Sequence, residues 1–264
     1  MQGFLAACWQ AGSMSDERVI SGSPPAGFPI PEAVRDVAGI HAVKGVWLNA
    51  LGGSTYRIGH GPDSRYAKWS PGQPVDAEID LESEARRMKW AGKFINVPAV
   101  LSVEQYPEGQ LLLTAALPGY SAVSELGKSN PERSAHALGQ GLRHLHDRLP
   151  ARQCPFSWDL SSRIASLPLS QQSELLAEAP PLDAVVCHGD ACLPNTQLDA
   201  NGGFLGHVDM GKLGIADRWA DLAIAAWSTE WNYGPGYEHL VYAGYGMEAN
   251  EEKIAFYRKI WDAT

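Results

Sequence analysis

The sequence lacks an apolar run that could cross a membrane. A transmembrane helix needs about 20 consecutive apolar residues, and the apolar segments here are all shorter. The N-terminal "LAAC" is similar to a lipoprotein cleavage site, but the segment before it is too short and has no basic residue. We expect a cytoplasmic protein that binds no membrane. Residues 1–13 are interpreted as an upstream extension before Met14, within a flexible N-terminal extension over residues 1–30.

Cysteine is scarce and shows no paired spacing. The four cysteines are Cys8, Cys154, Cys187 and Cys192, without a C-x-x-C motif. Reduced thiols in a cytoplasmic protein fit this usage best.

Positive charge is also in short supply. The 21 basic and 30 acidic residues give a net charge of −9. Such a chain repels nucleic acid and anionic membrane and can attract a polycation, although this balance is also ordinary for a soluble bacterial enzyme. The length of 264 residues allows one domain or two joined lobes. We expect a monomer or a weak dimer.

The sequence pattern changes from β-rich to helix-rich near residue 117. Before it, the pattern predicts a short helix, two strands, an amphipathic helix and two further strands, at residues 29–39, 46–59, 64–70, 75–92, 98–106 and 110–117. After it come a helix over residues 129–150, with its buried stripe at Leu138, Leu142, Leu145 and Leu149, and a mostly helical stretch to residue 180. Short strands over residues 184–209 and helices over 216–231 and 251–264 follow. The fold class is α+β with two lobes, at residues 31–117 and 118–264.

Five polar residues stand in the order that phosphoryl transfer requires. Lys68 lies in a strand, and Glu84 on the next helix flanks its apolar face; Glu82 could replace it as the partner of the lysine. Asp190 and Asn195 have the spacing of catalytic base and magnesium ligand in kinases, and Asp209-Met-Gly follows where a second metal ligand belongs.

Other readings explain fewer of these residues. The pairs His188-x-Asp190 and His207-x-Asp209 could indicate a metallohydrolase, which leaves Lys68 without a role. A nucleophilic pair of Cys187 or Cys192 with His188 is weaker, because adjacent residues on a turn seldom face one substrate. His188 is instead predicted to anchor its loop by hydrogen bonds.

Four segments resemble the aminoglycoside 3'-phosphotransferases, antibiotic-resistance kinases with a eukaryotic-protein-kinase-like fold. These are "LHDRLPARQCPF", "HGDACLPN", "DMGKLGIADRWADLA" and "IAFYR". The resemblance implies a small β-rich N-lobe and a larger helical C-lobe, with ATP or GTP and Mg²⁺ as cofactors. It also implies transfer of the γ-phosphate to a 3'-hydroxyl of an aminoglycoside, conferring resistance.

The resemblance also implies roles for single residues. Asp190 would be the catalytic base, and Asn195 and Asp209 the magnesium ligands. Lys68 and Glu84 would pair, as part of the nucleotide site. The remaining implied nucleotide contacts are Gly52, Gly53 and Ser54 in the loop over the phosphates, and Ala115 and Leu117, whose backbone would meet the adenine in the hinge.

The departures from the family pattern concern the acceptor. Lys212 replaces an arginine, and Trp227-Ser228 replaces an Arg-Asp pair. The candidate contacts to a polycationic acceptor are Asp159, Lys212, Glu230 and Asp262. Alternatives therefore remain open: a kinase of the same fold for a macrolide, a peptide antibiotic or a metabolite, or an idle binding protein. The idle binding protein is disfavoured, because an inactive site has no physical need of the complete set Lys68, Glu84, Asp190, Asn195 and Asp209.

Overall fold

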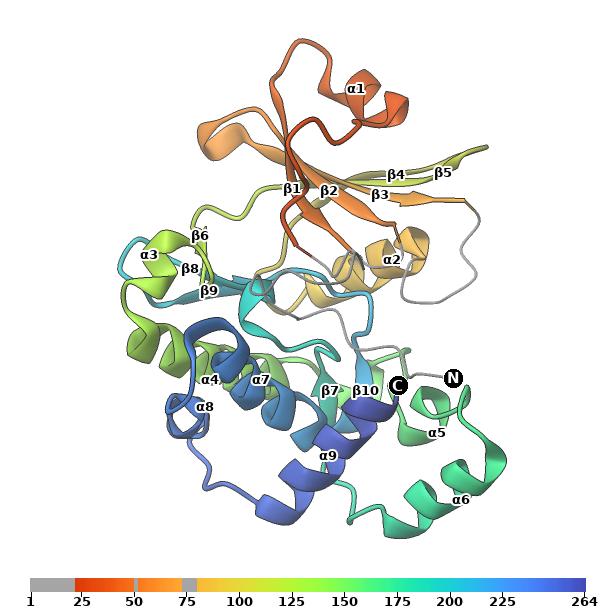
Figure 1. Ribbon diagram of the computed structural model, residues 1–264, viewed down its shortest axis with the longest axis vertical. Coiled ribbons are helices and arrows are strands. Elements are labelled where there is room, and N and C mark those ends of the chain that lie inside the picture. Colours follow the sequence, from red (N-terminus) through yellow and green to blue (C-terminus); the bar gives the residue numbers. More distant parts are fainter. Residues whose placement is uncertain (1–21, 50–51, 73–79) are drawn as a thin grey trace. The chain divides into compact units, whose positions relative to one another are not determined.

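The computed structural model describes residues 22–49, 52–72 and 80–264 (Figure 1). Contacts within the chain divide it into two units after Pro118. This boundary is next to residue 117, where the sequence pattern changes from β-rich to helix-rich. We call described residues 22–118 the N-terminal unit and residues 119–264 the C-terminal unit. No helix among the described residues is both long and apolar enough to span a bilayer.

The N-terminal unit is built on a five-stranded antiparallel sheet with the order β1-β2-β3-β5-β4. Its strands are β1 (Val43–Leu48), β2 (Ser54–Ile58), β3 (Arg65–Pro71), β4 (Val100–Tyr106) and β5 (Gly109–Ala115). Two helices, α1 (Glu32–Ala38) and α2 (Leu81–Ala91), accompany it, together with the short 3-10 helix η1 (Gly61–Asp63). This unit has its own buried cluster, which includes Tyr56, Ile58 and Leu111.

One predicted strand is two strands in the structure. Residues 46–59 were expected as a single strand, but the chain reverses between β1 and β2, with Leu48 opposite Ser54. Gly52 lies in this turn with φ of 85°, a left-handed conformation that favours glycine because it has no Cβ. Gly52 and Gly53, which suggested a phosphate loop, therefore also belong to the turn that follows β1. The β-branched and aromatic residues on both sides made the segment look like one continuous strand.

Residues 22–30 lie against the sheet, although the sequence placed them in a flexible extension. Gly22 exchanges two backbone hydrogen bonds with Leu48, of 2.9 and 2.7 Å. Phe28 and Ile30 pack on the buried cluster of the N-terminal unit. Burial of these apolar side chains offsets the entropy lost on ordering the segment. Residues 1–21 lie outside the described residues.

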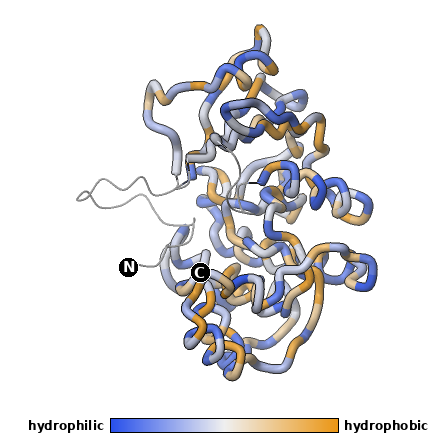
Figure 2. The backbone as a smooth tube through the Cα atoms, turned by 90° about the vertical axis from the view of Figure 1, so that its right-hand side faces the viewer, coloured by the Kyte–Doolittle hydropathy of each residue, from blue (hydrophilic) through white to orange (hydrophobic). Residues whose placement is uncertain are grey.

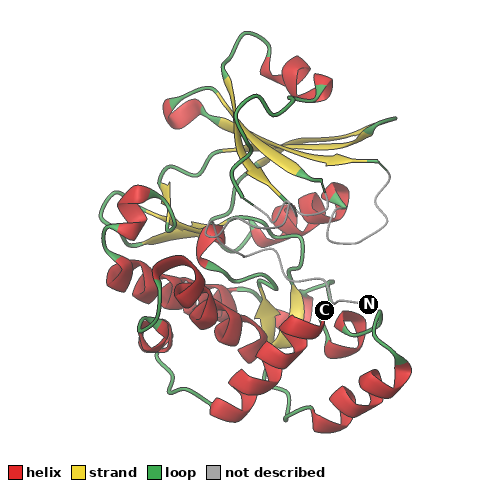
Figure 3. Ribbon diagram, viewed as in Figure 1, coloured by secondary structure: helices red, strands yellow, loops and turns green. Residues whose placement is uncertain are grey.

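Helices form most of the C-terminal unit (Figure 3). They are α3 (Glu125–Lys128), α4 (Pro131–Arg148), α5 (Leu160–Arg163), α6 (Leu169–Glu178), α7 (Trp219–Tyr233), α8 (Glu238–Tyr245) and α9 (Glu251–Ala263), with η3 (Ala151–Gln153) and η4 (Leu193–Asn195). Helices α4, α7 and α8 pack against one another (Figure 1). The sequence pattern did not reveal α8.

Helix α4 shows why these segments become helices. Asn130 caps it by accepting a hydrogen bond from Arg133 N at 3.1 Å, and Pro131 occupies its first position, where no backbone donor is needed. The predicted stripe is buried, with exposed fractions of 0% for Leu138, Leu142 and Leu145 and 3% for Leu149. Each such leucine contributes about 1.5–3 kcal/mol through burial. Along the coloured part of the tube, apolar residues are scattered rather than gathered in one segment (Figure 2).

Two small sheets hold the loops of the candidate site. One has the order β6-β8-β9 and consists of β6 (Tyr120–Ser121), β8 (Thr196–Leu198) and β9 (Phe204–His207). The other pairs β7 (Ala184–Cys187) with β10 (Gly214–Asp217). Among the described cysteines, Cys154, Cys187 and Cys192 form no disulfide, and the last two are buried. Cys8 lies outside the described residues.

Candidate active site

Lys68 and Glu84 form an ion pair in the N-terminal unit. Lys68 Nζ on β3 lies 2.8 Å from Glu84 Oε2 on α2, and the two side chains are 23% and 5% exposed. The alternative partner is excluded, because Glu82 is 64% exposed and pairs with Arg86 one helical turn away. An anchored ammonium group of this kind is suited to holding a phosphate.

The local sequence explains why Glu84 faces inward. Asp80 caps α2 by accepting hydrogen bonds from Glu82 N and Ser83 N at 3.1 and 3.2 Å. From this fixed start, Leu81, Ala85 and Met88 turn toward the interior at helical spacing, and Glu84 lies among them. A carboxylate on a buried face needs a partner, and Lys68 provides one.

The glycine-rich turn is held by Asn49. Gly53 N donates to Asn49 Oδ1 at 2.6 Å, and a side chain on Gly53 would collide with Asn49. Ser54 is buried at the start of β2. Contact of the Gly53 amide with a phosphate would therefore require Asn49 to release it. Residues 50–51 of this turn lie outside the described residues.

The predicted adenine contacts lie at the end of β5. Ala115 N donates to Ala99 O at 2.9 Å, and Ala116 N donates to Ser64 O at 3.0 Å. The Ala115 amide is thus committed to the sheet. An adenine contact here would have to use the Ala115 carbonyl or the backbone of Leu117.

In the C-terminal unit, the side chain of Asn195 is hydrogen-bonded directly to Asp190. Asn195 Nδ2 donates to Asp190 Oδ2 at 3.1 Å and to the Asp190 carbonyl at 2.9 Å. The other carboxylate oxygen, Asp190 Oδ1, is buried and has no hydrogen-bond partner among the described residues. A positioned carboxylate with one unused oxygen is what a base needs to accept a proton from a hydroxyl group.

His188 anchors this loop, as predicted. Its Nε2 donates to the Val208 carbonyl at 2.9 Å, and its Nδ1 accepts from Asp190 N at 3.2 Å. Both ring nitrogens are therefore used within the fold. His188 has no nitrogen left for chemistry.

Asp209 lies two residues after the end of β9. Val208 N donates to Asn195 O at 3.0 Å, so the segment before Asp209 is tied to the loop that carries Asn195. Asp209 has φ of 62°. Among the described residues, it is the one residue other than glycine with a positive φ. Such a conformation costs about 1–3 kcal/mol and is found at functional sites.

The donors in this region suit a hard divalent cation. Asp209 supplies carboxylate oxygens, and Asn195, whose amide nitrogen is bonded to Asp190, keeps its side-chain oxygen for another partner. Mg²⁺ prefers oxygen ligands of this type. The buried, unpartnered oxygen of Asp190 is a further negative group nearby.

Gly189 allows the loop to pass a neighbouring segment. It has φ of 86°, and a Cβ at this position would lie 2.4 Å from the carbonyl oxygen of Lys212. Any larger residue would clash and would also adopt an unfavourable conformation. Glycine is thus required immediately before Asp190.

The residues that hold this loop in place were not evident from the sequence. Asp221 on α7 is fully buried and accepts hydrogen bonds from His188 N and Gly189 N at 2.6 and 2.9 Å. His146 on α4 lies 3.1 Å from the same carboxylate. Ser228, at a departure from the family pattern, accepts from Leu193 N at 3.1 Å. An aspartate within the apolar helix "ADLAIAA" was the available signal.

Three buried side chains could suggest a further metal site. Ligand atoms of His146, Cys187 and Asp221 lie within 4.8 Å of one another. However, Asp221 already accepts backbone amides, and the Cys187 thiol donates to the Asp217 carbonyl at 3.2 Å. Burial also raises the pKa of Cys187, which opposes the thiolate that a metal requires. The cluster is a hydrogen-bonded support.

The predicted acceptor contacts have different environments. Asp159 caps α5, and hydrogen bonds from Ser157 Oγ and Ser162 N lower its pKa. Glu230 on α7 and Asp262 on α9 are exposed, and partial burial raises the pKa of Asp262. Lys212 lies beside two indole rings, those of Trp158 and Trp261.

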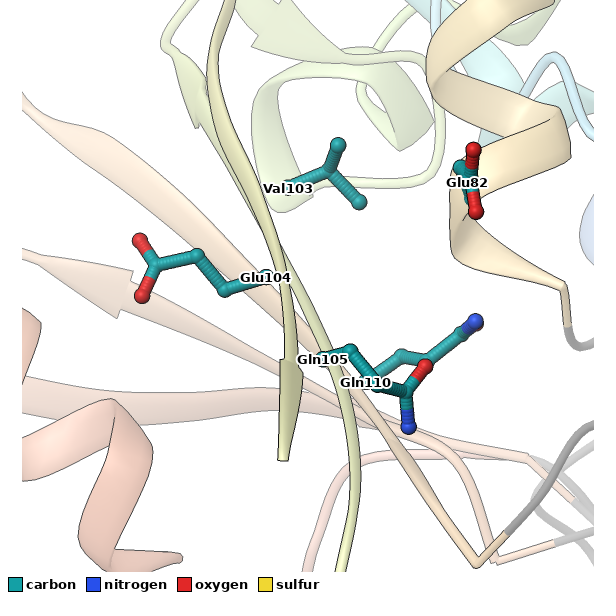
Figure 4. A pocket seen from close by; sticks show the side chains of 5 residues that line it. All are labelled: Glu82, Val103, Glu104, Gln105 and Gln110. Atoms are coloured by element: carbon teal, nitrogen blue, oxygen red, sulfur yellow. The ribbon is translucent and has the colours of Figure 1, made fainter. Parts of the chain in front are cut away.

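A cavity of about 200 Å³ lies in the N-terminal unit, lined by Glu82, Val103, Glu104, Gln105 and Gln110 (Figure 4). Val103 points from β4 toward the side of Glu82, whereas Glu104 points away from it (Figure 4). Gln110 Oε1 is already bonded to Leu81 N at 2.9 Å and fixes the start of α2. Glu82, the excluded alternative partner of Lys68, lines this cavity, and none of the other predicted site residues does.

Comparison with known proteins places these features in a family context. The sequence profile described as the phosphotransferase enzyme family matches residues 50–257. An aminoglycoside 3'-phosphotransferase from Streptomyces fradiae is 32% identical over 241 residues, which cover 78% of this chain and 89% of that protein.

Solved structures agree with this match. The crystal structure of an aminoglycoside 3'-phosphotransferase of type VIII is 27% identical, with a TM-score of 0.74 over 88% of this chain and 97% of that chain. An aminoglycoside phosphotransferase from Streptomyces rimosus in complex with ADP and streptomycin is 30% identical, with a TM-score of 0.63 over 80% and 90% of the two chains.

Proposed function

Because the chain belongs to the phosphotransferase enzyme family, we propose that it transfers the γ-phosphate of ATP to a hydroxyl group of an aminoglycoside. The observation that supports this most strongly is the joined pair of Asp190 and Asn195, with one carboxylate oxygen left without a partner. The similarity to aminoglycoside 3'-phosphotransferases indicates the 3'-hydroxyl as the acceptor. Antibiotic resistance is the expected consequence.

Asp190 acts as the base in this proposal. Its Oδ2 accepts a hydrogen bond from Asn195, which leaves Oδ1 as the oxygen that would take the proton of the acceptor hydroxyl. The hydroxyl oxygen then attacks the γ-phosphorus as the bond to the ADP oxygen breaks. Positioning and charge stabilisation supply most of the rate in such reactions.

The nucleotide is assigned to the Lys68 side chain and the glycine turn. Lys68, held by Glu84, pairs with the phosphates, and Gly52, Gly53 and Ser54 lie in the loop that covers them. Asn195 and Asp209 provide the oxygens for Mg²⁺. When bound, Mg²⁺ neutralises charge on the phosphates. Either ATP or GTP satisfies these contacts.

A second candidate acceptor site is the 3''-hydroxyl of streptomycin. The similarity to the enzyme solved with ADP and streptomycin supports it. The chain also departs from the 3' pattern on the acceptor side, at Lys212 and Trp227. Either reaction would take place in the cytoplasm, where ATP is available, in a monomer or a weak dimer.

Two measurements test the proposed function. The purified protein should release ADP with kanamycin, neomycin or streptomycin and not with a macrolide, and its expression should protect a susceptible bacterium against the same compounds. A soluble, folded protein that does neither would refute the proposal. Asp190→Ala should abolish turnover while nucleotide binding is retained, and near-normal turnover in that variant would refute the base assignment. Asp147→Ala, at an exposed surface ion pair, is the matched control.

A further inference from the structure

Lys212 lies between two tryptophans of the C-terminal unit. Its Nζ is 5.6 Å from the ring centre of Trp158 and 5.7 Å from that of Trp261. Both distances are within the range of about 6 Å in which an ammonium group is attracted to the face of an indole. The lysine therefore makes two cation–π contacts at once.

This group of side chains adjoins the loop that carries Asp190. The Lys212 carbonyl oxygen would lie 2.4 Å from a Cβ on Gly189, the residue before Asp190. On the other side, Trp261 shares a buried cluster with Cys192, which follows Asp190 by two positions. The two rings and the lysine are thus neighbours of the proposed catalytic loop within one unit.

The indole rings have different exposure. Trp261 is only 6% exposed, whereas Trp158 and Lys212 are half-buried. Trp158 also carries a buried indole Nε1 without a partner among the described residues. A lysine has a flexible four-carbon stem and a compact charge, so it can leave an aromatic pair at lower cost than a bidentate arginine.

We propose that Trp158 and Trp261 form a subsite for one alkylammonium group of the acceptor, and that Lys212 fills this subsite in the free protein. The acceptor as the ligand rests on the proposed function. Paired aromatic faces are a recognised means of binding ammonium ligands. Lys212 and the ligand compete for the same faces, so the lysine weakens binding of cations at this position.

Tetramethylammonium tests the subsite without any phosphoryl transfer. It is titrated into ¹⁵N-labelled full-length protein, and the indole signals of Trp158 and Trp261 are followed by NMR, with potassium chloride at equal ionic strength as the reference. We expect Lys212→Gln to bind tetramethylammonium about three- to tenfold more tightly than the wild type. Lys259→Gln, which removes an exposed, ion-paired lysine of α9, should leave the affinity unchanged.

The double variant Lys212→Gln, Trp158→Leu should lose the added affinity while it keeps the circular dichroism spectrum of the single variant. Equal affinities of wild type and Lys212→Gln, or shifts confined to other tryptophans, would overturn the proposal. Affinity unaffected by Trp158→Leu would do the same.

Inhibition connects the subsite to the acceptor. Tetramethylammonium should raise the KM of an accepted aminoglycoside without a change in kcat, and a purely noncompetitive effect would contradict the assignment. Absence of ADP release with every aminoglycoside refutes the proposed function alone, because binding to the indole rings is measured separately.

Discussion

His146 on α4 and Asp221 on α7 link these two helices next to the proposed catalytic loop. Nε2 of the histidine lies 3.1 Å from Oδ2 of the aspartate. The other ring nitrogen of His146 accepts from the Tyr245 hydroxyl at 2.9 Å. Burial by itself opposes ionisation of Asp221, but hydrogen bonding by His146 and the backbone outweighs it and lowers the pKa of the carboxyl group. Asp221 is therefore a charged buried anchor that acts on Asp190 through the backbone of residues 188 and 189.

Replacement of this anchor should affect both stability and turnover. Asp221→Asn places an amide group against backbone donors, so we expect the free energy of unfolding to fall by about 2–4 kcal/mol. We also expect kcat to drop more than tenfold at temperatures where the variant stays folded, with little change in the KM for ATP. Urea unfolding and steady-state kinetics measure these effects. Asp147→Asn, whose side chain is 53% exposed, should behave as wild type, and equal effects of the two variants would exclude the anchor role.

His207 should make the protein sensitive to acid. Burial, together with the neighbouring His188, lowers the pKa of His207 to about 3. Below a pH of about 6.5 the unfolded chain binds a proton that the folded chain rejects until about pH 3. The stability from this group is therefore complete above pH 6.5 and falls by about 1.4 kcal/mol per pH unit as the pH decreases.

His207→Phe keeps a ring in the buried site and removes the titration. Urea unfolding at pH 5, 6 and 7 should show a shallower loss of stability than in the wild type, by about one proton. His239→Gln changes an exposed histidine and serves as the control. Parallel pH dependences of wild type and His207→Phe would contradict the assignment.

Gly189→Ala separates a steric clash from backbone strain. The new Cβ would meet the Lys212 carbonyl at 2.4 Å and also face a φ of 86°, so we expect a loss of about 2–4 kcal/mol in the free energy of unfolding. Gly59 has φ of 77° with no atom within 4 Å of such a Cβ, and Gly59→Ala should cost about 1–2 kcal/mol. Equal losses in thermal and urea unfolding would show that the clash is relieved.

Glu84→Gln tests the ion pair of the N-terminal unit. The change removes the charge that holds Lys68 and keeps the shape of the side chain. We expect a loss of about 1–2 kcal/mol in the free energy of unfolding and at least a tenfold fall in kcat/KM for ATP. Glu82→Gln, on the same helix with a side chain 64% exposed, should change stability by less than about 0.5 kcal/mol. If both variants retain wild-type kcat/KM, Lys68 does not act on the nucleotide.

Local sequence patterns were sufficient for most elements. The helical spacing of Leu138, Leu142 and Leu145 predicted the buried face of α4, and all three are buried. The position of Glu84 beside an apolar stripe predicted that it flanks the buried face of α2, and its side chain is only 5% exposed. These features depend on neighbours within a few residues or on one helix face.

Other features could not be found in this way. The predicted strand over residues 46–59 is two strands, because a turn with left-handed Gly52 reverses the chain inside a run typical of strands. Helix α8 was missed, and so was the support by His146 and Asp221, which are separated by 75 residues. No local periodicity reports which distant side chain satisfies a buried carboxylate.

The sequence by itself determined the order of the chemical groups, from Lys68 and Glu84 to Asp190, Asn195 and Asp209, because a motif is a local property of the chain. Tertiary structure alone decided which groups are available for chemistry. His188 is committed to the Val208 carbonyl, the Ala115 amide to the sheet and Asp159 to a helix cap, whereas one oxygen of Asp190 has no partner among the described residues. The physical reason is that hydrogen bonds and burial are set by residues that meet only when the chain folds.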